Sequence, residues 1–118
     1  DRPLDVVFMG EEYHDFVIPR FGVDVAAMNA AVFRALKPGG LYVILDHEAA
    51  PGSGVSVAGT LHRIESAELR RQVEAAGFVF EGATEIVGNP DDDHSLSVFD
   101  ESIRGRTDRF VFRFRKPH

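Results

Sequence analysis

The sequence predicts an α/β domain in which helices pack against a mainly parallel sheet. Two observations carry this prediction. Short apolar runs typical of strands alternate along the chain with segments whose apolar residues recur at helical spacing. Residues 109–115 instead alternate with a period of two, which predicts a closing strand. Because single helices separate the first strands, we expect parallel pairing through right-handed crossovers, with the closing strand added in the antiparallel sense.

The first predicted strand covers residues 6–9, a β-branched apolar run that ends at Gly10. So short a run predicts a strand buried on both faces. In the polar loop that follows, Pro19 and Gly22 oppose a continuous helix. Asp24 is a favourable N-cap for the first long helix. The apolar positions of this helix follow at helical spacing: Val25, Met28, Val32, Phe33 and Leu36.

Residues 37–40, Lys-Pro-Gly-Gly, are expected to end this helix, because Pro bars continuation and Gly permits a left-handed cap. Residues 41–45 form a second strand of the doubly buried type, with an abruptly polar end at residues 46–48. The loop 51–59 is rich in Gly and Ser and long enough to fold over a site. Ser66 is expected to cap a second helix, with its apolar side on Leu69, Val73 and Ala76.

A third strand is predicted within residues 78–87, followed by an acidic loop over residues 88–101. The three successive aspartates at residues 91–93 lack the alternating carboxylates, mid-loop Gly and closing Glu of a calcium loop, so we interpret them as solvated. In the closing strand the arginines face away from Phe110, Phe112 and Phe114. We therefore interpret them as an exposed strand face rather than a surface for nucleic acid.

Composition excludes several classes of function. The formal net charge of −6 opposes a nucleic-acid-binding module, because phosphate contacts need a basic surface. The chain has no cysteine, which removes disulfides, thiol nucleophiles and thiolate metal sites. No apolar run approaches the roughly 20 residues that span a bilayer. At 118 residues the chain suits one domain, and we expect neither nucleic acid nor a membrane as its partner.

The chain opens on Asp1 rather than Met and enters strand-like sequence within a few residues. This predicts a start inside a longer protein, so that any targeting segment would lie upstream. The compartment stays open, with the cytoplasm as the default expectation and export of the parent protein as the alternative.

Several motifs together resemble a known family. Residues 36–40 (Leu-Lys-Pro-Gly-Gly) and residues 76–78 (Ala-Gly-Phe) each lead into an apolar strand. With the closing strand, they resemble the turns before strands five and six, and strand seven, of a Rossmann-like (class I) S-adenosylmethionine-dependent methyltransferase. The more specific stretches 13–15, 46–47, 61–64 and 97–110 are similar to a little-characterised bacterial group of predicted methyltransferases. Glu12 departs from that group, in which Asn is expected.

The resemblance implies that residues 1–118 form a single partial domain, the C-terminal half of a methyltransferase domain with strands four to seven. In the family, a glycine-rich loop after strand one holds the methionine part of S-adenosylmethionine, and an acidic residue after strand two holds its ribose. Both lie upstream of these residues, and Gly52, Gly54 and Gly59 follow the wrong strand to replace them. We therefore expect the cofactor to belong to the parent protein, and the isolated chain to be inactive.

Ligands of open α/β sheets bind beyond the carboxyl ends of the strands, where two polar clusters of this chain are expected to lie. The resemblance implies that Gly10, Glu11 and Tyr13 border the cofactor, while His14 and Asp15 face the acceptor. His14 is the best candidate for a general base, because imidazole titrates near neutral pH and Asp15 is placed to orient it. The alternative is that residues 13–15 only cap and brace their loop.

Three further residues are candidates for the site. His47 is a candidate catalytic residue in the same way as His14. The alternative is that His47 only stacks beside Asp46, whose carboxylate bonds nearby backbone amides. His62 and Arg63 either anchor an anionic acceptor and close the site, or bracket the helix entry with Arg63 paired to a surface acid. Histidines and carboxylates of these types bind zinc or iron, but the sequence shows no close ligand pair of recognised spacing. We therefore expect no metal site.

The leading functional hypothesis is methyl transfer to a small-molecule acceptor in the context of the parent protein. One alternative is another Rossmann-like nucleotide-binding domain, and a second is a non-enzymatic assembly module. The edge of the first strand is expected to pair with the missing N-terminal half. Without that half, the open apolar edge predicts self-association.

Overall fold

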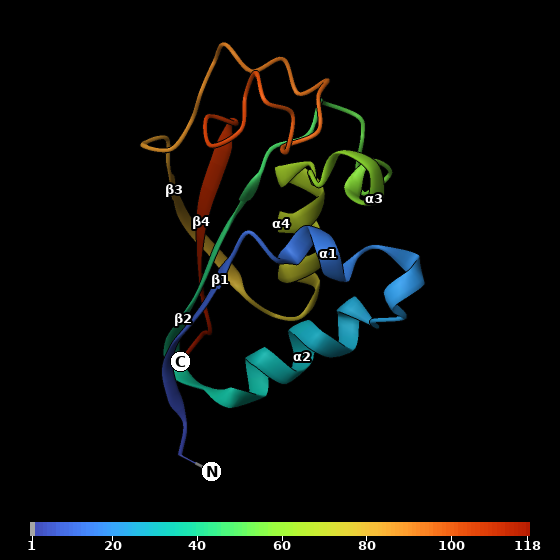
Figure 1. The fold of residues 1–118 in the computed structure, drawn as a ribbon. Helices are drawn as coiled ribbons and strands as arrows, with labels where there is room; N and C mark the ends of the chain where they lie inside the picture. Colours follow the sequence, from blue (N-terminus) through green and yellow to red (C-terminus); the bar gives the residue numbers. More distant parts are fainter. Residues whose placement is uncertain (1) are drawn as a thin grey trace.

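A four-stranded mixed sheet forms the centre of the molecule (Figure 1). The structure is a computed structural model that describes residues 2–118. The strands lie in the order β1-β2-β4-β3, with β1 parallel to β2 and β4 antiparallel to both of its neighbours. Their bounds are β1 Leu4–Gly10, β2 Leu36–His47, β3 Val79–Thr84 and β4 Arg109–Arg115. The predicted α/β class is confirmed, and the closing strand lies between β2 and β3.

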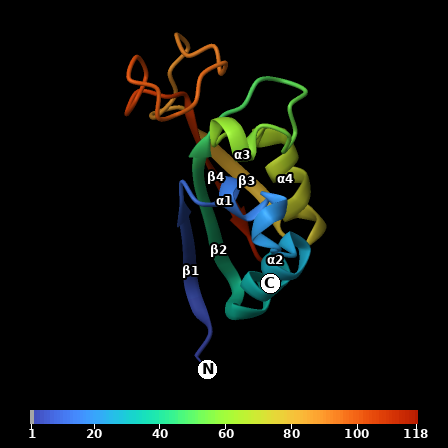
Figure 2. The same cartoon turned by 45° about the vertical axis from the view of Figure 1, so that its right-hand side comes forward.

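The helices that the structure describes lie along one face of this sheet (Figure 2). They are α1 Tyr13–Phe16, the 3-10 turn η1 Pro19–Phe21, α2 Val25–Ala35, α3 Ala58–Leu61 and α4 Ser66–Ala75. The predicted Asp24 cap is confirmed, because its Oδ1 accepts a hydrogen bond of 3.0 Å from the N–H of Ala27. Within residues 2–118, no helix has the length and apolar character needed to cross a membrane.

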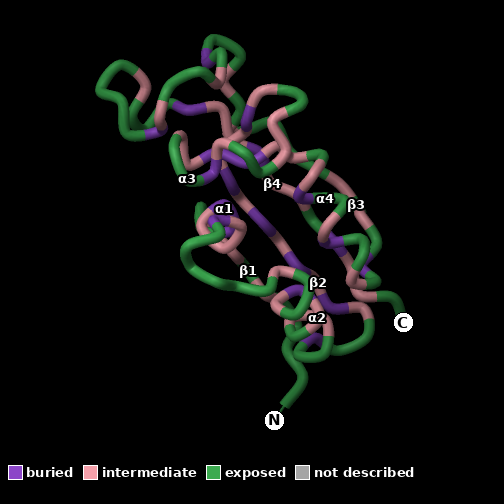
Figure 3. The backbone as a smooth tube through the Cα atoms, turned by 90° about the vertical axis from the view of Figure 1, so that its right-hand side faces the viewer, coloured by how far each residue is buried: buried purple, intermediate pink, exposed green. Residues whose placement is uncertain are grey.

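The hydrophobic core fills the space between the sheet and these helices. Buried and partly buried residues alternate along β2 (Figure 3), and the buried Tyr42 and Ile44 belong to the core. Leu69 and Val73 of α4 pack on them from the other side and are fully buried. Burying a side chain of this size stabilises the fold by about 1.5–3 kcal/mol. This packing fixes α4 and the end of β2 relative to one another.

The irregular first part of β2, where the register with β1 shifts between Leu36 and Leu41, depends on Gly40. A Cβ at this position would lie 2.9 Å from the carbonyl oxygen of Lys37 and 3.2 Å from that of Asp5. Since backbone atoms on two sides leave no room for a side chain, only glycine allows β1 to pack beside this part of β2. The strand is also longer than the predicted residues 41–45, because pairing with β1 already begins at Leu36.

Three local predictions are wrong, each for a reason that lies outside the local sequence. Ser66 is the first residue of α4 rather than its cap, and its N–H donates to Glu48 Oε1 at 2.9 Å. The first strand is not buried on both faces: Phe8 is 62% exposed, because the helices of residues 2–118 cover only the opposite face. Asp92 of the acidic loop is buried rather than solvated, because it pairs with a buried arginine.

Candidate functional site

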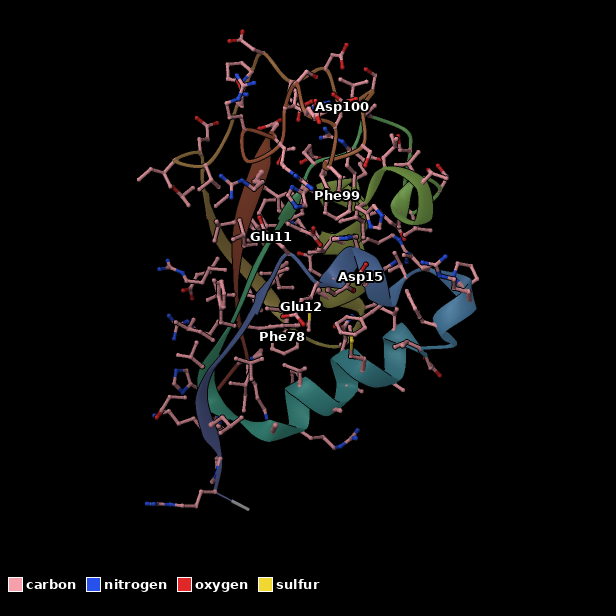
Figure 4. The ribbon with its side chains drawn as sticks, in the orientation of Figure 1. Glu11, Glu12, Asp15, Phe78, Phe99 and Asp100 are labelled. Carbon is pink, nitrogen blue, oxygen red and sulfur yellow. The ribbon has the colours of Figure 1, made fainter. Side chains whose placement is uncertain are left out.

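A cleft of about 300 Å³ opens at the carboxyl ends of β1 and β2, where the sequence places the site. It lies between the end of the sheet, α1, the residue after α3 and the long loop that follows β3. Its lining comprises Glu11, His14, Asp15, His47, His62, Val98 and Phe99. Figure 4 shows that Glu11, Asp15 and Phe99 approach this region from three different segments. A larger cavity of about 480 Å³, bordered by α4 and residues 88–90, contains none of the predicted site residues.

The turn from β1 into α1 places the first polar cluster at the cleft. Glu11 adopts a left-handed backbone with a φ of 57°, and its N–H donates to the carbonyl oxygen of Leu45 at 2.7 Å. This bond ties the turn to the neighbouring strand and directs the chain away from the sheet. Left-handed backbone at a non-glycine residue costs of order 1–3 kcal/mol and is concentrated at functional sites. The turn therefore sets the position of the helix that carries His14.

His14 is held by a buried carboxylate on the neighbouring strand. Its Nδ1 lies 2.7 Å from Asp46 Oδ1, and its backbone N–H donates to Asp46 Oδ2 at 2.8 Å. A carboxylate only accepts hydrogen bonds, so in the neutral form of the ring the proton resides on Nδ1 and the lone pair on Nε2. Nε2 faces Asp15, whose Oδ1 lies 3.3 Å away. The partner that orients His14 is thus Asp46, while Asp15 stands on the other side of the ring.

The pKa values of the two histidines nearest the sheet are shifted in opposite directions. Burial opposes the charged form of His14, but the hydrogen bond and charge of Asp46, with Asp15 and Glu11, outweigh it and raise its pKa. Burial dominates at His47 and lowers its pKa. His47 Nδ1 is 2.7 Å from the Thr107 hydroxyl, and its ring centre is 5.9 Å from that of His14. The cleft therefore holds one imidazole that gains a proton readily beside one that stays neutral.

His62 enters the cleft from the end of α3. It occupies the left-handed C-cap position of that helix with a φ of 59°. Its ring packs edge-on against Phe99, with ring centres 4.9 Å apart, and against His14 at 5.5 Å. His62 Nδ1 lies 3.9 Å from Asp15 Oδ1. The structure thus brings together four of the five predicted catalytic residues: His14, Asp15, His47 and His62.

Arg63 does not reach the cleft. Its side chain is fully buried and forms two hydrogen bonds to Asp92, of 2.8 and 3.1 Å. Two further donors bond the carbonyl oxygens of Leu96 and Glu48, each at 2.9 Å. The predicted pairing with an acid is present, but the acid is buried and the pair fastens the long loop to the end of β2. We call this arrangement the Arg63–Asp92 bracket.

Of the residues expected to border a cofactor, one lines the cleft and one is buried in the core. Gly10 ends β1 and Glu11 lines the cleft. Tyr13 is fully buried; its hydroxyl donates to Gln72 Oε1 at 2.8 Å and accepts from Asn29 Nδ2 at 2.9 Å. Burial raises the pKa of Tyr13 to about 12. Its side chain therefore stabilises the packing of α1 on α2 and α4 and does not line the cleft.

The sequence interpretation missed part of the site. Val98 and Phe99 line the cleft from the acidic loop, and Thr107 from the same loop bonds His47. The partner of His14 could have been predicted from the position of Asp46, because Asp46 stands at the end of the neighbouring predicted strand. The expectation of no metal site rested on the absence of a close ligand pair. That reason does not hold in the folded chain, where ligand atoms of His14, Asp15 and His62 lie within 4.8 Å of one another.

The sequence matches no known protein-family model and no curated protein. Solved structures do match. The N-methyltransferase NodS from Bradyrhizobium japonicum WM9 aligns over 100% of this chain and 53% of its own, with 13% identity and a TM-score of 0.62. The [4+2]-cyclase SpnF covers 99% of this chain and 51% of its own, at 17% identity and a TM-score of 0.66. A putative methyltransferase from Bacillus halodurans covers 100% and 66%, at 17% identity and a TM-score of 0.62.

These structures define the fold. Residues 2–118 have the fold of part of a class I S-adenosylmethionine-dependent methyltransferase domain, as the motifs predict. The chain spans about half to two thirds of the length of the three structures described above. One of them is described as a [4+2]-cyclase, so this fold carries more than one chemistry. Function must therefore be argued from the site.

Proposed function

We propose that residues 1–118 are the C-terminal half of a methyltransferase domain, and that they form the acceptor side of its site within a longer parent protein. Strands β1, β2, β3 and β4 would then be strands four, five, six and seven of a seven-stranded sheet. The observation that carries this proposal is the His14–Asp46 pair, which opens into a cleft at the carboxyl ends of two parallel strands.

The residues present suit one side of a site for S-adenosylmethionine. The turn after β1 has no side chain at Gly10, and the carboxylates of Glu11 and Asp15 favour a cation nearby. When bound, this cofactor supplies an electrophilic methyl group on a positively charged sulfur. Within residues 2–118, the turn after β1 provides no second glycine to hold the methionine part. We therefore assign the rest of the cofactor site, and the activity, to the parent protein.

His14 is positioned to remove the acceptor's proton as the methyl group is transferred. Its Nε2 lone pair faces the cleft, Asp46 holds the ring through Nδ1, and the Asp15 carboxylate stabilises the imidazolium that forms. Positioned bases of this kind contribute about 10²–10⁴-fold to a rate. His47 and His62 complete the wall on which the acceptor lies. A cleft of about 300 Å³ favours a small-molecule acceptor carrying a hydroxyl or an amine.

Titration calorimetry with S-adenosylhomocysteine tests this function. We expect saturable binding to the parent protein, because it would supply both halves of the site. The 118-residue chain alone is expected to bind far more weakly or not at all. Binding to neither protein would overturn the methyltransferase assignment and favour another Rossmann-like nucleotide-binding domain or an assembly module.

The exposed edge of β1 supports the proposal that a further strand pairs with it. Among residues 2–118 this edge has no strand partner, and Val6 and Phe8 of β1 are 51% and 62% exposed on the face that these helices leave uncovered. Parallel strands are almost always covered on both faces. We propose that the N-terminal half of the parent covers both the edge and this face.

The chain without that half is expected to self-associate through β1. Light scattering at rising concentration should show a mass above that of a monomer, and Val6→Lys should shift it toward the monomer, because lysine opposes edge pairing. Val79→Lys is the matched control, since Val79 is similarly exposed on the other edge strand, β3. A stable monomer at high concentration, or an equal effect of the two variants, would contradict the proposal.

A further inference from the structure

Three metal-binding side chains from two distant segments converge in the cleft. One nitrogen of His14, one nitrogen of His62 and one carboxylate oxygen of Asp15 all lie within 4.8 Å of one another. Asp15 Oδ1 is 3.3 Å from His14 Nε2 and 3.9 Å from His62 Nδ1. Zinc bonds of about 2.0–2.1 Å in a tetrahedron place ligand atoms about 3.3 Å apart. The two distances from Asp15 Oδ1 are therefore close to those between the ligand atoms of a bound ion, and the two ring nitrogens lie within 4.8 Å of one another.

The surroundings of His14 match those of a metal-ligating histidine. Such a histidine donates its other ring N–H to a carboxylate, which fixes the tautomer and raises the basicity of the ligating nitrogen. Asp46 fills this role, because it is fully buried and its Oδ1 lies 2.7 Å from His14 Nδ1. A second bond, from the backbone N–H of His14 to Asp46 Oδ2, fixes the main chain as well. The Nε2 atom is thus held in one direction, toward Asp15.

His62 is held toward the same point at a cost in backbone energy. Its φ of 59° lies in the left-handed region, which a histidine adopts at about 1–3 kcal/mol when the surroundings enforce it. The N–H of His62 donates to the carbonyl oxygen of Ala58, and Phe99 packs against the ring. These contacts restrict the ring to the side of the cleft on which Asp15 lies. A function that requires the ring in this position would explain why the strained backbone is present.

We propose that His14, Asp15 and His62 form a binding site for a divalent transition-metal ion of the zinc class. Two imidazoles and one carboxylate are a ligand set that zinc and ferrous iron accept, whereas Mg²⁺ and Ca²⁺ prefer oxygen alone. Three protein ligands leave a fourth position for a further molecule, as in catalytic zinc sites. That position faces the cleft, where it would bind an oxygen or nitrogen atom of the molecule that occupies it.

The metal site is built from this chain alone and does not depend on methyl transfer. The ion and the acceptor's proton compete for the same atom, His14 Nε2. In the metal-bound state, the ion would lower the pKa of a bound hydroxyl, whose proton would pass to water instead of to the imidazole. Zinc binding without a cofactor therefore tests the site separately from the proposed function, and failure of either proposal leaves the other standing.

Calorimetric titration of ZnCl₂ into the 118-residue chain near neutral pH is the decisive experiment. We expect one zinc ion per chain and no saturable binding of Mg²⁺. Asp15→Asn and His62→Asn should each weaken zinc binding at least about tenfold. Both variants preserve the local backbone, since Asn tolerates the left-handed conformation at residue 62. Cobalt(II) should give the intense visible absorption of tetrahedral coordination, and this absorption should be lost in both variants.

His118→Gln is the matched control, because it removes an exposed histidine at the end of the chain, outside the cluster. Zinc affinity should be unchanged in this variant, and circular dichroism should show that all three variants keep the fold. The proposal is overturned if the unsubstituted chain takes up no zinc saturably. It is equally overturned if the Asp15 and His62 variants bind zinc as tightly as the unsubstituted chain does.

Discussion

Replacing Arg63 with Met is expected to lower the free energy of unfolding by about 3–5 kcal/mol, a large part of the total stability of a small domain. Arg63 and Asp92 are both buried, and the substitution leaves the carboxylate without its cation. Burial alone raises the pKa of Asp92, but hydrogen bonds from Arg63 and from two backbone N–H groups outweigh it and lower the pKa overall. The carboxylate is therefore charged at neutral pH. Urea denaturation followed by circular dichroism measures the loss.

Two further variants show whether the loss arises from the bracket. Arg113→Met removes a more exposed arginine that lies 3.2 Å from Glu81, and we expect a change of at most about 1 kcal/mol. In the double variant Arg63→Met/Asp92→Asn, part of the lost stability should return, because no uncompensated charge remains buried. A loss at Arg63 no larger than that at Arg113 would contradict a buried bracket.

Replacing His14 with Gln in the parent protein is expected to reduce the rate of methyl transfer about 10²–10⁴-fold. Gln retains a donor for Asp46, so the buried carboxylate keeps a partner while the proton acceptor is lost. A group that acts in the transition state lowers kcat and kcat/KM together. Steady-state kinetics in the presence of a chelator excludes a contribution from a bound metal ion. The measured loss then reports only on the removal of the proton acceptor. Affinity for S-adenosylhomocysteine should be unchanged.

His94→Gln is the matched control for this variant. His94 also forms a pair with an aspartate, at 2.8 Å between Nε2 and Asp108 Oδ2, but it does not line the cleft. Its substitution should leave the rate within about twofold, as for a site away from the chemistry. Similar rates for the His14 variant and the unsubstituted parent would remove His14 from the mechanism.

Elements whose pattern depends on near neighbours in the sequence could be predicted from it. The Asp24 cap, the helical spacing of α2 and the alternation of β4 are local effects, and all three are present. The apolar exposure of β1 was not predicted, because it depends on what packs on each face of the sheet. A short apolar run has the same pattern whether one face or both are covered.

The site was predicted in part, for a related reason. The rule that ligands bind at the carboxyl ends of strands places His14 and His47 at the same edge of the sheet. It says nothing about residues that arrive from loops. Arg63 and Asp92 are 29 residues apart in the sequence. His14 and His62 are separated by α2, β2 and α3. The Arg63–Asp92 pair depends on how the loop after β3 folds back, and the acidic composition of that loop predicted that it is solvated. The approach of His62 to His14 depends on the segment between β2 and α4.

Because of the Arg63–Asp92 bracket, the residues of the long loop that stabilise the fold differ from those that contact the cleft. Asp92 anchors the loop near its start, and the N–H of Val98 donates to the carbonyl oxygen of Leu61 at 3.1 Å. Directly after the second of these fixed points, Phe99 presents its ring to the cleft while 57% of its surface remains exposed. Side chains at this position can be exchanged without disturbing the core. The loop is thus a natural place to redesign which molecules the cleft admits, with the sheet, His14 and His47 left intact.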